Sequence, residues 1–147
     1  MAHVILDTST FPLVVATLPE EVHGADLERL FADYAAVYAR HEQFAAITDL
    51  SRLSKMPGAK ERKMIAEWLR SMDDKVRRYG LCTILLVRSP LVRGALTATG
   101  WIFAPPIPHF YPATFEEALD IATAQLHAAG LEAPADVSAL RRRTAAR

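Results

Sequence analysis

Short apolar runs rich in β-branched residues alternate along this chain with longer segments whose apolar residues recur at helical spacing. Strands are predicted at residues 4–6, 13–18, 44–48, 81–87 and 107–111. Helices are predicted from residue 24 or 26 to 42, and at 60–79, 91–103 and 115–126. Parallel strands need long crossover connections, which are usually helices. The order β-β-α-β-α-β-α-β-α therefore predicts an α/β fold with a mostly parallel central sheet flanked by helices.

Two helices have clear start signals. Ser89 followed by Pro90 is typical of a helix start, with Ser as the cap and Pro in the first turn. The helix that follows, at 91–103, is apolar almost all round, so we expect it to be buried. Thr114, three residues before Glu117, has the spacing of a capping box and predicts the start of the last helix.

The length of 147 residues suits one domain, and 51% hydrophobic with 23% charged residues is ordinary for a globular protein. We expect a single domain over residues 1–130. After Gly130 the helical period is lost, so residues 131–147 are predicted to be a C-terminal tail, either a short helix or a frayed end.

Simple features also bear on the compartment. The N-terminus lacks the basic and apolar stretches of a signal peptide, and the uncharged segment 94–115 contains four prolines, which excludes a membrane-spanning helix. The single cysteine, Cys82, excludes an internal disulfide, and its place in an apolar strand predicts an inert thiol. We therefore expect a cytoplasmic protein.

Catalytic patterns are missing from the sequence. There is no glycine-rich phosphate loop, no dinucleotide fingerprint and no nucleophile elbow. The five histidines are scattered without metal-ligand spacing, and His41-Glu42 lacks the second histidine of a zinc helix. We expect no enzyme activity, no cofactor and no metal.

The charges are segregated although they cancel overall. Residues 1–50 hold eight acids and two bases, a net charge of −6, whereas residues 51–100 hold eleven bases and four acids, a net charge of +7. This asymmetry favours an acidic protein partner or a homodimer, and the alternative is a set of solvated helix faces. The arginines at 141–143 are too few to predict nucleic-acid binding.

Three places are candidate sites. Asp49 and Ser51 follow a predicted central strand, where α/β folds place ligands, although such residues also form simple turns. The helix at 60–79 has a basic face interleaved with acids, which suits a partner surface or a solvated face. The segment 101–111, WIFAPPIPHFY, is rich in aromatics and proline and suits an apolar pocket or plain core.

Three segments together resemble a known family. They are FAAITDLS at 44–51, KERKMIAEWLRSMDDKVRRY at 60–79, and the strand, S-P-hydrophobic-R-G-A-L helix, Pro-Pro break and final F-x-E-A-L helix at 81–119. In order and texture they resemble the STAS superfamily of anti-anti-sigma regulators, and within it the SpoIIAA-like branch, also termed STAS/SEC14-like. The resemblance covers about residues 3–128.

The resemblance implies a non-catalytic regulatory module that binds a protein partner in bacterial signalling. The implied interaction surface consists of Asp49, Ser51, Ser54, Gly58, Lys60, Arg62 and Lys63. In phosphorylated STAS regulators a D-S-S-G sequence starts the helix after the D-L-S strand and carries the phosphorylated serine. Here that window is Pro57-Gly58-Ala59-Lys60, so the usual acceptor is absent.

The SEC14-like label implies an alternative, a carrier or sensor of a small apolar ligand such as a lipid. The apolar helix and the aromatic segment after it would then line a pocket. The residues expected there are Leu96, Trp101, Phe103, Phe110 and Tyr111.

Overall fold

Five strands form one sheet in a computed structural model, which describes residues 4–98, 106–133 and 140. The strands are β1 (Ile5–Asp7), β2 (Leu13–Thr17), β3 (Phe44–Asp49), β4 (Gly80–Leu86) and β5 (His109–Phe110). They lie side by side in chain order, with β1 antiparallel to β2 and every other pair parallel. The predicted mostly parallel sheet is therefore confirmed.

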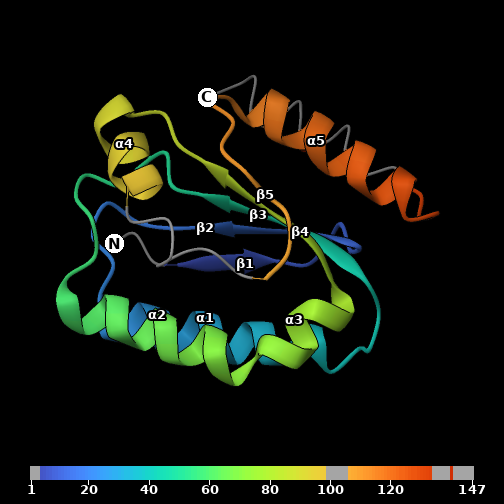
Figure 1. The fold of residues 1–147 in the computed structure, drawn as a ribbon, viewed down its shortest axis with the longest axis horizontal. Coiled ribbons are helices and arrows are strands. Elements are labelled where there is room, and N and C mark those ends of the chain that lie inside the picture. The colour runs from blue at the N-terminus through green and yellow to red at the C-terminus, as the bar shows by residue number, and fades with distance from the viewer. Residues whose placement is uncertain (1–3, 99–105, 134–139, 141–147) are drawn as a thin grey trace.

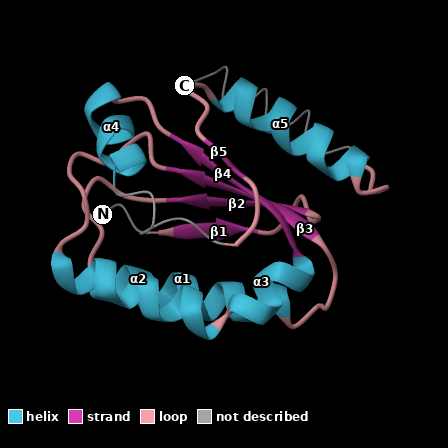
Figure 2. Cartoon of the chain, viewed as in Figure 1, coloured by secondary structure: helices cyan, strands magenta, loops and turns pink. Residues whose placement is uncertain are grey.

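Helices connect and cover the parallel strands. They are α1 (Gly24–Tyr38), α2 (Ala59–Ser71), α3 (Asp73–Tyr79), α4 (Pro90–Ala98) and α5 (Phe115–Ala128). Helices α1, α2 and α3 lie along one face of the sheet and α5 lies on the other, while α4 sits beside one end of the strands (Figures 1 and 2).

Strand alternation divides the core between these two faces. On β2 and β3, Val14 and Ala46 pack with the α1–α2 side, whereas Leu13 and Ala45 pack with the α5 side. Leu140 is 6% exposed and belongs to the α5-side cluster. One residue of the predicted tail thus contributes to the core.

Two start signals are confirmed. The Thr114 hydroxyl accepts a hydrogen bond from the Glu117 amide at 3.1 Å, so α5 has the expected side-chain cap. Helix α4 begins at Pro90, and the Ser89 hydroxyl accepts a bond from the Val92 amide at 3.3 Å.

The helix predicted at 60–79 is wrong as one element, because the structure breaks it at Met72. At the end of α2 the Trp68 carbonyl accepts hydrogen bonds from both the Ser71 hydroxyl, at 2.7 Å, and the Met72 amide, at 3.0 Å. Asp73 and Asp74 then fall in the first turn of α3, where the helix dipole favours acids.

Two further expectations for helices need correction. The first helix ends at Tyr38 rather than residue 42, because His41 adopts a positive φ of 55° that a helix cannot continue through. The helix predicted at 91–103 is described only to Ala98, and it is not buried all round, since Leu91 is 84% exposed. Residues 99–103 lie outside the described part.

Candidate functional site: the β3–α2 loop and the groove beside it

The β3–α2 loop (residues 50–58) leaves the central strand of the sheet. Strands β2, β3 and β4 are parallel, so their carboxyl ends share one edge. Open α/β sheets place their binding sites at this edge. The loop therefore occupies the position where this fold class builds functional surfaces.

The carboxylate of Asp49 is occupied locally. Asp49 is only 4% exposed, and its Oδ1 atom accepts a hydrogen bond from the Ser51 amide at 2.9 Å. The Asp49 carbonyl also accepts from the Leu18 amide at 3.1 Å. Asp49 and Ser51 thus form the simple turn that the sequence allows as an alternative to a ligand site. The buried Asp49 carboxylate presents little surface to a partner.

The middle of the loop is tied to the segment before α1. The amide and the hydroxyl of Ser54 both donate to the Glu20 carbonyl, at 3.0 and 3.1 Å. Lys55 Nζ lies 3.0 Å from Glu21 Oε1. The hydrogen bond and charge of Lys55 lower the pKa of the Glu21 carboxyl. Hydrogen bonds from Ser54 and an ion pair from Lys55 thus hold the loop against residues 20–21.

Gly58 is the N-cap residue of α2 and offers no side chain to cap the helix. Gly58 is extended, at φ −66° and ψ 173°, and its carbonyl accepts from the Arg62 amide at 2.9 Å. A Cβ atom added at Gly58 would lie 3.0 Å from Glu61 Oε2, the mobile end of a side chain. The position therefore has room for a small side chain, but no hydroxyl stands in the window 57–60.

Basic side chains follow on the first turns of α2. Lys60 and Lys63 are exposed and Arg62 is half-buried. Lys63 Nζ lies 3.9 Å from Glu67 Oε1, a loose pair one turn along the helix. Of the predicted interaction surface, Ser54 and Gly58 are exposed beside these cations, Ser51 is half-buried and Asp49 is buried.

A groove of about 340 Å³ lies between this loop and the segment before α1. Its lining residues are Glu21, Val22, His23, Lys55, Met56, Pro57, Gly58 and Glu61. The sequence predicts docking on the loop 54–59 and the helix after it, which contain five of these residues, but it gives no sign of Glu21, Val22 and His23. The available signal was topological, because residues 18–23 follow β2, whose carboxyl end neighbours that of β3.

Of the residues predicted to line an apolar pocket, the structure describes the side chains of Phe110 and Tyr111. Phe110 packs in the α5-side cluster and Tyr111 in the α1–α2-side cluster, so successive strand positions separate them. Trp101 and Phe103 lie outside the described residues, as does the side chain of Leu96.

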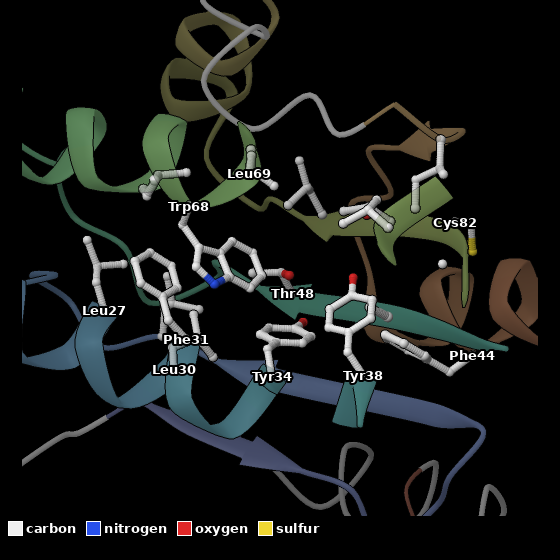
Figure 3. Close-up of a pocket in the computed structure, with 18 of the residues that line it drawn as sticks. Leu27, Leu30, Phe31, Tyr34, Tyr38, Phe44, Thr48, Trp68, Leu69 and Cys82 are labelled. Carbon is white, nitrogen blue, oxygen red and sulfur yellow. The ribbon is translucent and has the colours of Figure 1, made fainter. Parts of the chain in front are cut away.

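An apolar cavity of about 120 Å³ instead lies between α1, α2 and the sheet (Figure 3). Phe31 and Trp68 stack across the two helices, with ring centroids 4.7 Å apart and planes 6° from parallel. Tyr34 and Tyr38 lie along the α1 side of the same space. Large rings from neighbouring helices thus leave room that their flat shapes do not fill.

Other chemistry has little support in the described part of the chain. No group of three or more His, Cys, Asp or Glu side chains there is placed to hold a metal ion. Burial raises the pKa of the Cys82 thiol to about 11, which keeps it protonated, as its place in an apolar strand predicts. None of the described helices has the length and apolarity needed to cross a membrane.

The chain matches no protein-family model and no curated protein sequence. Solved structures are similar to it. The phosphorylated form of the Bacillus cell fate determinant SpoIIAA is 24% identical with a TM-score of 0.54, covering 80% of this chain and 97% of its own. The anti-sigma factor antagonist SpoIIAA in its unphosphorylated form is 24% identical with a TM-score of 0.57, covering 80% and 94%.

An anti-sigma factor antagonist from Mycobacterium paratuberculosis is also similar, at 19% identity and a TM-score of 0.54, covering 81% of this chain and 92% of its own. These likenesses extend over nearly the full length of each neighbour. With its α/β order and mostly parallel five-stranded sheet, the chain therefore has a STAS fold of the SpoIIAA-like kind.

Proposed function

We propose that this chain is a non-catalytic regulatory module that binds another protein, in the manner of an anti-sigma factor antagonist. The observation that carries the proposal is the β3–α2 loop, which is anchored to residues 20–21 and leads into exposed cations on α2. The fold shared with anti-sigma factor antagonists supports it. We place the protein in the cytoplasm, in bacterial signalling.

The docking surface in this proposal consists of Ser54, Gly58, Lys60, Arg62 and Lys63, together with the rim of the groove. Anchoring of the loop lowers the conformational entropy that docking would cost. Exposed lysines at the start of α2 favour a partner with an acidic patch, mainly by steering its approach. Each cation is solvated before binding, so we expect the steering to weaken with added salt.

Control by phosphorylation at the start of α2 is not part of this proposal. Residues 57–60 are Pro-Gly-Ala-Lys and offer no hydroxyl. Ser54 is exposed, but its hydroxyl donates to the Glu20 carbonyl, and it precedes the first residue of α2, Ala59, by five residues. We therefore expect binding to be governed by the level of the partner or by another signal.

The test is a double charge reversal, Arg62→Glu with Lys63→Glu. Affinity capture from cells that contain the protein identifies a partner by mass spectrometry, and calorimetry with that purified partner gives the dissociation constant. We expect the double variant to bind at least tenfold more weakly, because two attractive charges become repulsive.

A matched control carries the same change of charge elsewhere. Lys75→Glu with Arg78→Glu alters two exposed cations on α3, away from the loop. The control should bind within about twofold of the parent, since charges beyond a Debye length of roughly 8 Å are screened. Equal loss in both pairs would reject the loop surface, and equal binding by all three proteins would reject it too. Light scattering on the same samples tests for a homodimer.

The alternative of a lipid carrier is not favoured. The described cavity of about 120 Å³ is smaller than the pockets of roughly 300–1,000 Å³ that hold drug-sized ligands. A lipid chain does not fit such a space.

A further inference from the structure

The cavity under α1 and α2 has a lining that is unusual for a simple packing defect. Most of the wall is apolar, but side chains with hydroxyl or indole N–H groups also reach it, namely those of Tyr34, Tyr38, Thr48, Trp68 and Thr83. In Figure 3 the hydroxyls of Tyr38 and Thr48 and the indole of Trp68 face the same space. Apolar walls with a few convergent polar groups are typical of small-molecule sites.

The phenol groups remain able to donate hydrogen bonds across the physiological range of pH. Burial raises the pKa of Tyr34 to about 12, and a hydrogen bond with Thr48 opposes this shift. Burial also raises the pKa of Tyr38, and the neighbouring Tyr34 raises it further. Both side chains are therefore neutral donors at neutral pH.

The ring of Tyr38 packs against two other aromatic rings. Its ring packs edge-on against Phe44, at a centroid distance of 5.1 Å, and lies 6.3 Å from the ring of Tyr34. Among the described side chains, no unpaired polar atom is fully shut off from a water-sized probe. Tyr38 lines the cavity and its hydroxyl points into it in Figure 3, so an occupant there can accept a hydrogen bond from this hydroxyl.

Size and shape limit the occupant. An apolar cavity of about 150 Å³ is known to take up benzene, so about 120 Å³ suits one ring with slight adjustment of the wall. Phe31, Tyr34, Tyr38 and Trp68 all line the cavity, and aromatic walls favour an aromatic ligand. Leu69 and Ile107 line the cavity and are half-buried, so the wall reaches the surface there and can open.

We propose that this cavity is a binding site for a small single-ring aromatic molecule with one hydroxyl or carbonyl group, which would bond to Tyr38 and Thr48. The proposal does not rest on the protein-binding function above. It differs from a lipid carrier in both place and ligand, because its site is the α1–α2 layer and its ligand is one ring.

The first experiment titrates the protein with phenol and, in parallel, with toluene, a control ligand of similar size that lacks the hydroxyl. The indole N–H resonance of Trp68, assigned with the variant Trp101→Phe, should shift with saturable dependence on phenol. At phenol concentrations about ten times the dissociation constant, Tm should rise by about 3–6 °C. Absence of a saturable shift at millimolar phenol would overturn the proposal.

Two variants locate the binding. Ala46→Leu adds volume on the β3 wall of the cavity and should abolish the shift, while Ala36→Leu makes the same change on the exposed side of α1 and should leave it intact. Tyr38→Phe keeps the ring and removes one hydroxyl. This variant should bind phenol about 3- to 10-fold more weakly than the parent and bind toluene with unchanged affinity.

Tyr38→Phe keeps the proposal testable if Ala46→Leu fails to fold, which circular dichroism would show. Phenol binding that survives in a folded Ala46→Leu protein would place the ligand elsewhere and reject the site. If Tyr38→Phe lowers the affinity for phenol and for toluene equally, the Tyr38 hydroxyl has no hydrogen-bonding role. The cavity would then bind apolar molecules nonspecifically, which also contradicts the proposal.

Discussion

The two faces of the sheet are packed in different ways. On one face, α5 presents Ala118, Leu119, Ala122 and Leu126, each 0% exposed, so the helix lies close to the strands. On the other, α1 and α2 contribute large aromatic rings, and a cavity of about 120 Å³ remains between them and the sheet. Protein interiors are normally close-packed, so a remaining cavity distinguishes this face from the α5 face. The α5 face is thus fully packed, whereas the α1–α2 face contains a cavity.

The largest expected effect is on the α5 face. Leu119→Ala should lower the free energy of unfolding by about 3–5 kcal/mol, because a fully buried leucine leaves a new hole in a tight layer. Leu69→Ala, at a half-buried position beside the cavity, should cost about 1–2 kcal/mol, since fewer contacts are lost. Urea titration measures both, and equal losses would contradict the difference between the faces.

Alkali should act on the aromatic face. The pKa of Tyr34 rises from 10.0 to about 12 on folding, so the unfolded chain loses this proton first. The ionisation of this group therefore leaves the free energy of unfolding unaffected below pH 10. The free energy of unfolding falls by about 3 kcal/mol in all as the pH rises toward 12. Tyr34→Phe should reduce the slope of stability against pH in this window, measured by urea titration. An unchanged slope would show that Tyr34 ionises normally.

Adding volume should have opposite signs on the two faces. Ala118→Leu on α5 should destabilise by about 1–3 kcal/mol, because no space exists for the added atoms. Ala46→Leu borders the cavity and should be neutral or stabilise by up to about 1 kcal/mol. Thermal and urea unfolding report the sign, and destabilisation by both variants would mean that the cavity does not accept these atoms.

The smallest expected effects concern how one helix on each face begins. Thr114→Ala removes the cap of α5 and should cost about 1 kcal/mol. Gly58→Ser offers α2 a cap that it lacks, and should gain only a few tenths of a kcal/mol, because glycine is itself tolerated there. Urea titration of the two single variants checks the contrast. Identical magnitudes would show that capping is worth the same on both faces.

The face with regular packing was the more predictable from sequence. Helix α5 follows from a cap signal and a stripe of buried residues, and β3 and β4 follow from apolar runs. Apolar residues alone gave wrong predictions for two other helices. They do not report which side of a helix is covered, so Leu91 was expected in the core although it is 84% exposed. The break at Met72 lies inside a stretch of continuous helical spacing, so the period of apolar residues does not reveal it.

The candidate site was predictable only in part, for similar reasons. Exposure of Ser54, Gly58 and Lys60 agrees with a surface at the end of β3, but burial of Asp49 depends on its bond to the Ser51 amide. The groove and the cavity are volumes between segments that are distant in the chain. Their existence depends on how side chains meet across helices, and no spacing in the sequence measures that.

Leu140 limits how the protein can be shortened. It follows α5 by more than ten residues, yet it is 6% exposed within the same cluster as Leu119 and Leu126. A version that stops at residue 130, where helical periodicity ends, would uncover an apolar patch on that layer. Such an exposed patch invites aggregation. A crystallisation or tagging scheme should therefore retain Leu140 and attach any fusion after it.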